Sequence, residues 1–410
     1  MTWELLSETL RLEHYNTRLV VFGVAFLGAT AGLVGSFLLL RKQSLLGDAL
    51  SHATLPGIGI AFAVMAAMGL SGKSLPGLLI GASITGLLGV LLVLAIRKTT
   101  RLKDDAAMGI VLSVFFGLGV AILKMVERIP GQSAAGLDGF IYGKTASMIW
   151  SDFVLIAIIL LITIIVTIAI LKELTLLCFD ADFASAQGWP TLWLDIILMA
   201  LVTAVTVIGL QAVGLILVIA FLITPPTAAR FWTNRLGWML FLSATIGAIS
   251  GWLGVSISAL YSNLPAGAII VITAAIIFLF SMIFGTARGI LPRYLRHLQL
   301  QRKVGRQHLL RSTYEILENT QNGEPLKNLP ISMDLLRQHR YWGKGELPRL
   351  IRQGRSEDHI ERQPSGELRL SESGFGEASR ITRNHRLWEL YLIKYADIAP
   401  AHVDRYADMV

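Results

Sequence analysis

Asp48 and His52 are the side chains of this sequence whose types and spacing best suit metal chemistry. They stand four residues apart, so both project from one face if the segment is helical. A carboxylate and an imidazole placed this way can both contact one divalent transition-metal ion. The run that holds them, at 41–62, is otherwise largely apolar, and ionisable groups inside a membrane are costly unless they line a cavity or hold an ion. The pair is therefore a candidate metal site, with Ser44 and Ser51 as candidate secondary oxygen ligands.

A plainer interpretation of the pair stays open from spacing alone. In it, Asp48 caps a helix and His52 forms a hydrogen bond inside a helical bundle. Cys178 is the only cysteine of the 410 residues, so neither an internal disulfide nor a thiolate metal cluster can form. Any metal chemistry must therefore use histidine, carboxylate and backbone oxygen ligands.

The sequence as a whole has the composition of a membrane protein. Hydrophobic residues make up 54% and charged residues 16% of the chain, and the mean hydropathy is +0.61, which is too apolar for a soluble protein of this length. A spanning helix needs about 20 mostly apolar residues, and about nine stretches meet or nearly meet that length. We therefore expect an all-α polytopic membrane domain at 1–286. The stretches lie at roughly 18–40, 52–70, 75–96, 107–126, 152–171, 190–209, 212–229, 238–262 and 265–285.

The distribution of lysine and arginine indicates how these helices are oriented. Cytoplasmic loops carry an excess of both residues. One orientation places every basic cluster in the cytoplasm, with the N-terminus and the loop 127–150 outside and the C-terminal part inside. The clusters are Arg41 with Lys42, Arg97 with Lys98, Arg101 with Lys103, Lys172, Arg230 with Arg235, and Arg288 with Arg293 and Arg296.

The segment after about residue 293 is of a different kind. Residues 287–410 carry 36 charged side chains and a net charge of +6, against 28 and +2 in residues 1–286, and such a basic segment suits nucleic acid or anionic lipid headgroups. Three helix candidates precede EDHIERQPSGELRLSESG, which reads as a β-hairpin around Pro-Ser-Gly. Three helices and a hairpin predict an α+β winged-helix-like domain at 293–370, followed by a helical segment at 371–410. The helix candidates are 308–319, 332–339 and 344–353.

The run SLLGDALSHATLPGIGIAF resembles the signature of the zinc, manganese and iron permeases of the ATP-binding-cassette (ABC) importers. GLQAVGLILVIAFLITPPTAARFW, at 209–232, is similar to a later motif of that family. FDADFASAQGW, at 179–189, resembles the segment that touches the ATPase. The resemblance covers about residues 17–285 and implies a permease in whose translocation path Asp48 and His52 coordinate manganese, zinc or iron.

The same resemblance implies partners and a location. We expect a homodimer of permeases with two ATPase subunits and an external solute-binding protein, in the cytoplasmic membrane of a bacterium. No covalently bound cofactor is expected, because the metal is the cargo and ATP binds the partner subunit. The ATPase would dock on 173–189, where Glu173, Asp180 and Asp182 can meet basic residues; a solvated loop is the alternative.

ATP hydrolysis is expected on a separate chain, so the protein is predicted to be a transport subunit and not an enzyme. GLSGKS at 69–74 ends like a phosphate-binding loop, but Ala67 stands where the first glycine is required. The segment also falls on the predicted outer side of the membrane.

Pro225 and Pro226 lie in the second motif, ITPPTAAR. Proline has no backbone N–H and disrupts a helix interior, so the two residues are expected to interrupt a helix and free backbone carbonyls. Such an interruption suits a hinge, and a plain kink is the alternative.

QHLLRSTYEILE and the later run containing NHRLWELYL resemble the diphtheria-toxin-repressor family of metal-responsive winged-helix regulators. The resemblance implies a sensor site that uses His308, His385 and Asp408. It is incomplete, because His308 and Arg311 stand where that family often has a carboxylate and the chain ends before its usual Glu-His pair. A structural or regulatory module is the alternative. Basic residues around the third helix are candidate DNA contacts or a solvated face: Arg340, Lys344, Arg349, Arg352 and Arg355.

Two other functions stay open. A permease for a metal chelate would share the architecture without needing Asp48 and His52. A secondary transporter with a regulatory DNA-binding-like tail would need no ATPase. One carboxylate and one imidazole suit manganese, zinc and iron alike, so the residues do not identify the metal.

Overall fold

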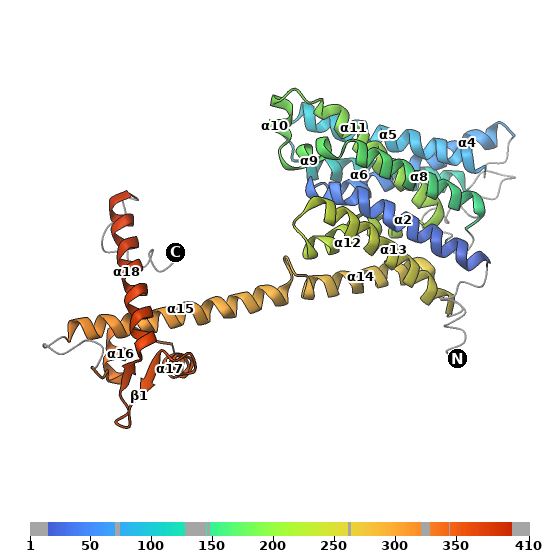
Figure 1. Cartoon of the computed structure of the whole chain (residues 1–410). Coiled ribbons are helices and arrows are strands. Elements are labelled where there is room, and N and C mark those ends of the chain that lie inside the picture. The colour runs from blue at the N-terminus through green and yellow to red at the C-terminus, as the bar shows by residue number, and fades with distance from the viewer. Residues whose placement is uncertain are drawn as a thin grey trace. The chain divides into compact units, whose positions relative to one another are not determined.

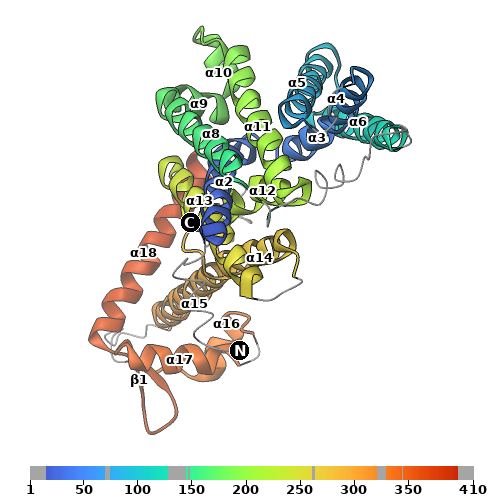
Figure 2. The same cartoon turned by 90° about the vertical axis from the view of Figure 1, so that its right-hand side faces the viewer.

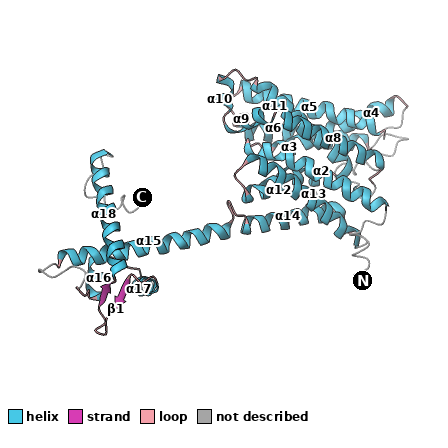
Figure 3. Ribbon diagram, in the orientation of Figure 1, coloured by secondary structure: helices cyan, strands magenta, loops and turns pink. Residues whose placement is uncertain are grey.

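The structure is a computed structural model that describes residues 15–69, 74–127, 145, 148–260, 264–320, 329–343 and 345–395. The chain divides into two compact units, 1–292 and 293–410. Each unit is described separately here. In the residues described, strands occur only in the second unit (Figure 3).

The first unit is a helical bundle (Figure 1). Within the described residues, nine helical segments are long and apolar enough to span a membrane, which confirms the expected number. They are α2 (Tyr15–Leu40), α3 with α4 (Leu46–Ala53 and Leu55–Ala67), α5 (Leu75–Thr99), α6 (Asp104–Val126), α8 (Trp150–Ala169), α11 (Thr191–Val213), α12 (Leu215–Trp232), α13 (Leu236–Leu260) and α14 (Ala266–Phe284). Two short helices, α9 (Leu171–Phe179) and α10 (Ala181–Ala186), connect α8 to α11.

α2 is the most buried helix of this bundle. Of its most apolar stretch 72% is buried, against 17% for α8 and 22% for α14. It packs against α8, α12 and α13. A Cβ atom at Gly28 would collide with the Gly247 carbonyl, and one at Gly247 would collide with that of Gly28. α2 and α13 therefore touch backbone to backbone, the close packing that small residues allow between membrane helices.

The peripheral helices expose large apolar side chains. Ile84 of α5, Leu118 of α6 and Ile168 of α8 are all exposed. An apolar surface of this extent is unfavourable in water but is solvated by hydrocarbon, while the helices satisfy their own backbone polar groups. The surface thus agrees with the composition in requiring a bilayer.

α12 runs without interruption through Pro225 and Pro226, so the expected break is absent from the structure. Pro226 cannot donate to the Leu222 carbonyl one turn earlier, because it has no N–H. Gly35 of α2 lies against this carbonyl, and a Cβ at position 35 would collide with it. Neighbouring helices commonly accommodate proline within membrane helices in this way, so the segment stays helical.

α15 (Ile290–Asn319) crosses the boundary into the second unit, which also contains α16 (Met333–His339), α17 (Glu346–Ser356), β1 (Ile360–Arg362), β2 (Leu368–Leu370) and α18 (Glu372–Tyr395). The predicted hairpin is confirmed: β1 and β2 pair antiparallel with Ile360 opposite Leu370. α15 begins eighteen residues before the expected position 308, since its first turns are amphipathic and lack the hydropathy of a span. The winged-helix assignment stays a prediction. The core consists of Leu309, Leu310, Ile316, Leu317, Ile331, Leu336, Leu347, Leu350, Ile351, Ile360, Leu368, Leu370 and Ala378.

Candidate functional site

α3 is an amphipathic helix of eight residues that carries both Asp48 and His52. Leu46, Ala49 and Leu50 are buried together with Ala53, the spacing of one helix face. α3 packs against α5, α6 and α11, and the second view shows it among these helices (Figure 2). The sequence-based boundary of the second span, at about 52, was wrong, because α3 begins at Leu46 and continues through a turn at Thr54 into α4.

Two glycines hold α3 close to its neighbours. A Cβ at Gly47 would lie 2.8 Å from Leu222 Cδ1 of α12. A Cβ at Gly89 of α5 would lie 2.7 Å from Ala53 Cβ. Both distances are too short for a real Cβ contact without a shift, so glycine at these positions allows the packing that fixes α3.

The side chains of Asp48 and His52 lie together on the other side of α3. His52 Nε2 is 3.3 Å from Asp48 Oδ1, and the two side chains are 17% and 28% exposed. Phe116 of α6 packs edge-on against the imidazole, with ring centroids 4.8 Å apart. His52 Nδ1 is buried without a hydrogen-bond partner. The pair is therefore accessible and only partly satisfied, as a site for an incoming ligand would be.

The spacing of these two atoms fits shared coordination of one ion. Metal bonds to imidazole nitrogen and carboxylate oxygen are about 2.0–2.2 Å long. At tetrahedral or octahedral angles, two such ligands lie roughly 3 to 3.5 Å apart. The observed 3.3 Å falls in this range, so an ion can bind both without a change in α3. No group of three His, Cys, Asp or Glu side chains gathers in the residues described, so one chain offers two such ligands here.

Ser51 and Ser44 differ in burial and in their position relative to Asp48 and His52. Ser51 is fully buried, and its hydroxyl donates to the Gly47 carbonyl at 2.7 Å. Ser51 thus faces the bundle interior because it lies on the buried face of α3, and the expectation that it lines the path is corrected. Ser44 is half-buried in the turn before α3.

A buried ionic network at the α2–α3 turn was missed by the sequence analysis. Arg41 pairs with Asp195 of α11, and both side chains are largely buried. Asp104 at the start of α6 accepts from Arg97 at 2.9 Å and from Gln43 at 3.3 Å. The sequence showed Arg41 and Arg97 only as orientation signals, since nothing local identifies their acidic partners.

Burial also changes the ionisation of this network. It lowers the pKa of the Arg41 guanidinium, because the charged form loses hydration. Cys178 of α9 lies near Arg41, and burial raises the pKa of its thiol to about 11. The network thus connects the turn before α3 with the helix that begins the predicted docking segment.

Comparison with known proteins identifies the family of this chain. A model described as the ABC 3 transport family matches residues 13–285. The chain belongs to this family. It is 36% identical over 396 residues to the manganese transport system membrane protein MntC of Bacillus subtilis strain 168, covering 97% of this chain and 88% of that protein.

Two further relatives match about seven tenths of this ABC 3 family chain. The zinc transport system membrane protein TroC of Treponema pallidum strain Nichols is 42% identical over 282 residues, covering 69% of this chain and 93% of that protein. The solved structure of PsaBC from Streptococcus pneumoniae in complex with Fab is 32% identical, with a TM-score of 0.60 over 72% of this chain and 99% of the other. The ABC 3 match therefore coincides with the bundle that carries Asp48 and His52.

The predicted docking segment of this family member forms α9 and α10. Asp180 caps α10 by accepting from the Phe183 N–H at 2.8 Å. Asp182 is exposed in the first turn of α10, and Glu173 is half-buried in α9. Phe179 and Phe183 are both exposed beside these carboxylates. The segment thus offers acidic and aromatic groups at one end of the bundle.

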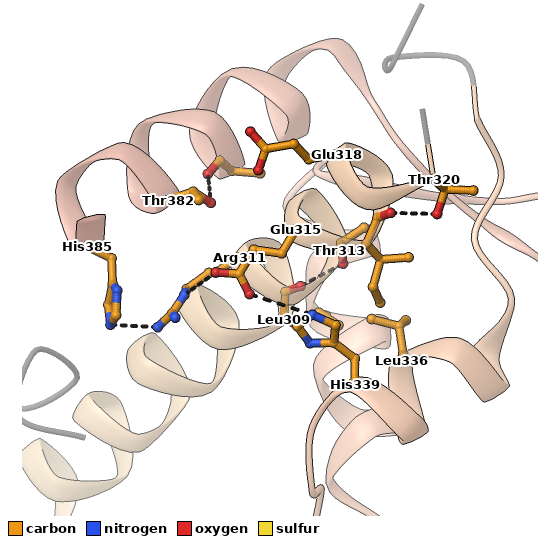
Figure 4. A network of polar contacts seen from close by, with 12 residues as sticks. Leu309, Arg311, Thr313, Glu315, Glu318, Thr320, Leu336, His339, Thr382 and His385 are labelled. Atoms are coloured by element: carbon orange, nitrogen blue, oxygen red, sulfur yellow. Dashed lines mark hydrogen bonds and ion pairs between the residues drawn. The ribbon is translucent and has the colours of Figure 1, made fainter. Parts of the chain in front are cut away.

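The predicted sensor histidines of the second unit each lie beside an arginine, and Figure 4 shows His385 with Arg311. His385 Nε2 is 2.6 Å from Arg311, whose guanidinium also donates to Glu315 at 2.7 Å. His308 Nε2 is 3.3 Å from Arg340. A guanidinium that donates to an imidazole Nε2 occupies the lone pair of that nitrogen and repels a cation from it. Asp408 lies outside the described residues.

The candidate DNA contacts are divided between two environments. Arg349, Arg352 and Arg355 are exposed on α17, on the side opposite buried Leu347 and Leu350. Arg340 is half-buried beside His308. Other predicted features lie outside the described residues: Lys344, most of the GLSGKS run and most of the loop 127–150.

Proposed function

We propose that this chain is the permease subunit of an ABC importer that carries a divalent transition metal, manganese, zinc or iron. The observation that carries the proposal is the accessible Asp48–His52 pair, whose ligand atoms are 3.3 Å apart on one side of α3. Its relatives include a manganese and a zinc transport protein, which supports a metal as cargo. The chelate permease and the secondary transporter have no such support.

The proposed site binds its cargo weakly. One carboxylate and one imidazole per chain hold a dication less firmly than a closed four-ligand cage, so the ion can leave when the helices move. In a homodimer, which we propose as the working assembly, two such pairs can face one path. Asp48 supplies charge, and His52 supplies a softer nitrogen held by Phe116.

The remaining parts of the proposal concern partners and orientation. An external solute-binding protein delivers the ion, and two ATPase subunits dock on 173–189 in the cytoplasm of a bacterial cell. Exposed Phe179 and Phe183 with acidic Asp180 and Asp182 suit a basic partner with an apolar groove. The second unit lies in the cytoplasm as a winged-helix-like module. Arginines beside His308 and His385 favour a structural role over metal sensing.

The decisive experiment is uptake of radioactive manganese, zinc and iron by cells that carry the wild type, Asp48→Ala or His52→Ala. Loss of a direct ligand should lower uptake of the cargo metal by at least about tenfold in both variants, since even indirect ligand partners have effects of 10–100-fold. Asp105→Asn, which alters an exposed carboxylate of the same unit, should transport normally. Normal uptake by both site variants, at equal protein levels, would remove the proposed site.

A further inference from the structure

An apolar stripe recurs on one side of α15, interrupted by Gln301, Arg302 and Gly305, and only its C-terminal half is covered. Eighteen residues make about five helical turns, so Leu291 lies on the same side as Leu309, and Leu295 on the same side as Thr313. Leu309 and Thr313 are buried in the core of the second unit. The other helices of this unit gather around that half of α15 (Figure 1).

The N-terminal half of the stripe is exposed. Ile290 is 56%, Leu291 40%, Tyr294 57% and Leu295 49% exposed. These four residues fall within one arc of about 140° at 100° per residue, the width typical of a helix face that is meant to be covered. An exposed apolar face of this width indicates an apolar partner for residues 290–298.

The charges around this stripe all have one sign. Arg293 and Lys303 are exposed away from the stripe, and Arg302 is exposed at its edge. In the sequence, no Asp or Glu occurs between Asp195 and Glu315. The partner of this face must therefore accept apolar groups and carry negative charge.

The start of α15 is fixed where two spanning helices end. Only five residues separate Phe284, the last residue of α14, from Ile290. In that connection, Ala287 donates its N–H to the Phe231 carbonyl at 3.0 Å, and Arg288 Nε donates to Asn234 Oδ1 at 3.0 Å. Phe231 belongs to the last turn of α12, so the first turn of α15 begins at the edge of the spanning region.

We propose that residues 290–303 form an interfacial helix that binds the anionic lipid surface of the leaflet at which α12 and α14 end. Ile290, Leu291, Tyr294 and Leu295 enter the boundary between headgroups and acyl chains, and the arginines and lysine contact lipid phosphates. A second copy of residues 290–303 is a poor alternative, because pairing would bring together two segments whose Lys, Arg, Asp and Glu residues are all basic. Nucleic acid would leave the apolar stripe exposed. The proposal is independent of the transported metal.

The test uses the full chain in lipid nanodiscs. In a Cys178→Ser background, Leu295→Cys carries an environment-sensitive dye, and Leu300→Cys, five residues on and 58% exposed on the side away from the stripe, carries it as a matched control. Discs contain phosphatidylcholine alone or with phosphatidylserine, together with a quencher attached to shallow acyl carbons. We expect strong quenching at position 295, little at 300, and more quenching at 295 in the anionic discs.

A charge variant separates lipid binding from simple proximity to the disc. Each basic residue near an anionic surface strengthens binding roughly fivefold. Arg293→Gln with Arg302→Gln and Lys303→Gln should therefore return quenching at 295 in anionic discs to the level in phosphatidylcholine discs. These side chains are exposed, and size-exclusion chromatography checks that the variant stays folded.

Two results would overturn the proposal. Equal quenching at 295 and 300 would show that the stripe does not face lipid. Energy transfer between dyes at position 295 of two chains in one disc, without lipid quenching, would assign the stripe to a second copy.

Discussion

The chemistry of single residues in this protein follows from what surrounds them. Asp48 and His52 share an accessible side of α3, while Ser51, one residue from His52, faces the interior and donates to a carbonyl. Cys178, which lies outside the candidate site, also has chemistry that depends on its surroundings. Its thiol is surrounded by protein near the Arg41 guanidinium, and burial outweighs the positive neighbour.

Alkylation of Cys178 should therefore be slow at neutral pH. The thiolate is the reactive form, and a rise of the pKa from 9.0 to about 11 lowers its population at pH 8 by roughly a hundredfold. The rate of modification by a small maleimide in the folded chain should keep rising about tenfold per pH unit from pH 8 to 10. Stopped-time labelling read by intact mass measures this rate. Unfolding in detergent should return the pKa of the thiol to its ordinary value. A modification rate that reaches a plateau below pH 9 in the folded protein would contradict the prediction.

Between helices, the contact around Leu222 joins three elements. Its carbonyl, left without a helical donor by Pro226, lies against Gly35 of α2, and its side chain lies against Gly47 of α3. The helix that carries Asp48 and His52 is thus packed directly on the proline-containing helix. This contact gives the hinge hypothesis for Pro225 and Pro226 a physical basis, because movement of α12 here must also move α2 or α3.

Gly35→Ala should destabilise the bundle because a methyl group would meet the Leu222 carbonyl. Overpacking of this kind costs about 1–3 kcal/mol of stability. The apparent melting temperature in detergent, followed by loss of monodisperse protein, should fall by several degrees. Gly117→Ala is the matched control, since nothing lies within 4 Å of a Cβ added on that face of α6. Equal melting temperatures for the two variants would refute the packing argument.

The whole chain consists of two compact units, and the two units require different solvents. Residues 1–292 have a core and an apolar outer surface, while residues 293–410 have a small core of their own. The match to TroC spans 282 residues and 93% of that protein, so a chain of about the length of the first unit is nearly a whole protein there. The first unit is therefore expected to fold without the second.

A chain that ends at Pro292 should insert into the membrane and purify as a monodisperse particle. The reason is that the spanning helices form their own core and satisfy their own backbone groups. Expression of a fluorescent fusion followed by size-exclusion chromatography measures the outcome, with the full chain as reference. Aggregation of the shortened chain alone would show that the second unit is structural for the first.

Local patterns in the sequence were sufficient for the elements themselves. Apolar stretches of spanning length, the four-residue spacing of Asp48 and His52, and the turn between β1 and β2 are properties of neighbouring residues, and the structure agrees with each as an element. Hydropathy is less informative where polar residues enter a helix. It placed the second span late, because Asp48 lowers the local average, and it missed the first turns of α15.

Contacts between distant residues required the folded chain. The partners Arg41 and Asp195 are more than 150 positions apart in the sequence, and only packing of α2 against α11 brings them together. The same applies to α12, whose prolines predict a break that Gly35 and its neighbours accommodate. Secondary structure arises from short-range backbone and hydropathy preferences, whereas burial, pairing and ionisation depend on which surfaces meet in three dimensions. That is why the helical spacing of Asp48 and His52 could be predicted from the sequence, but the accessible side of α3 on which they lie could not.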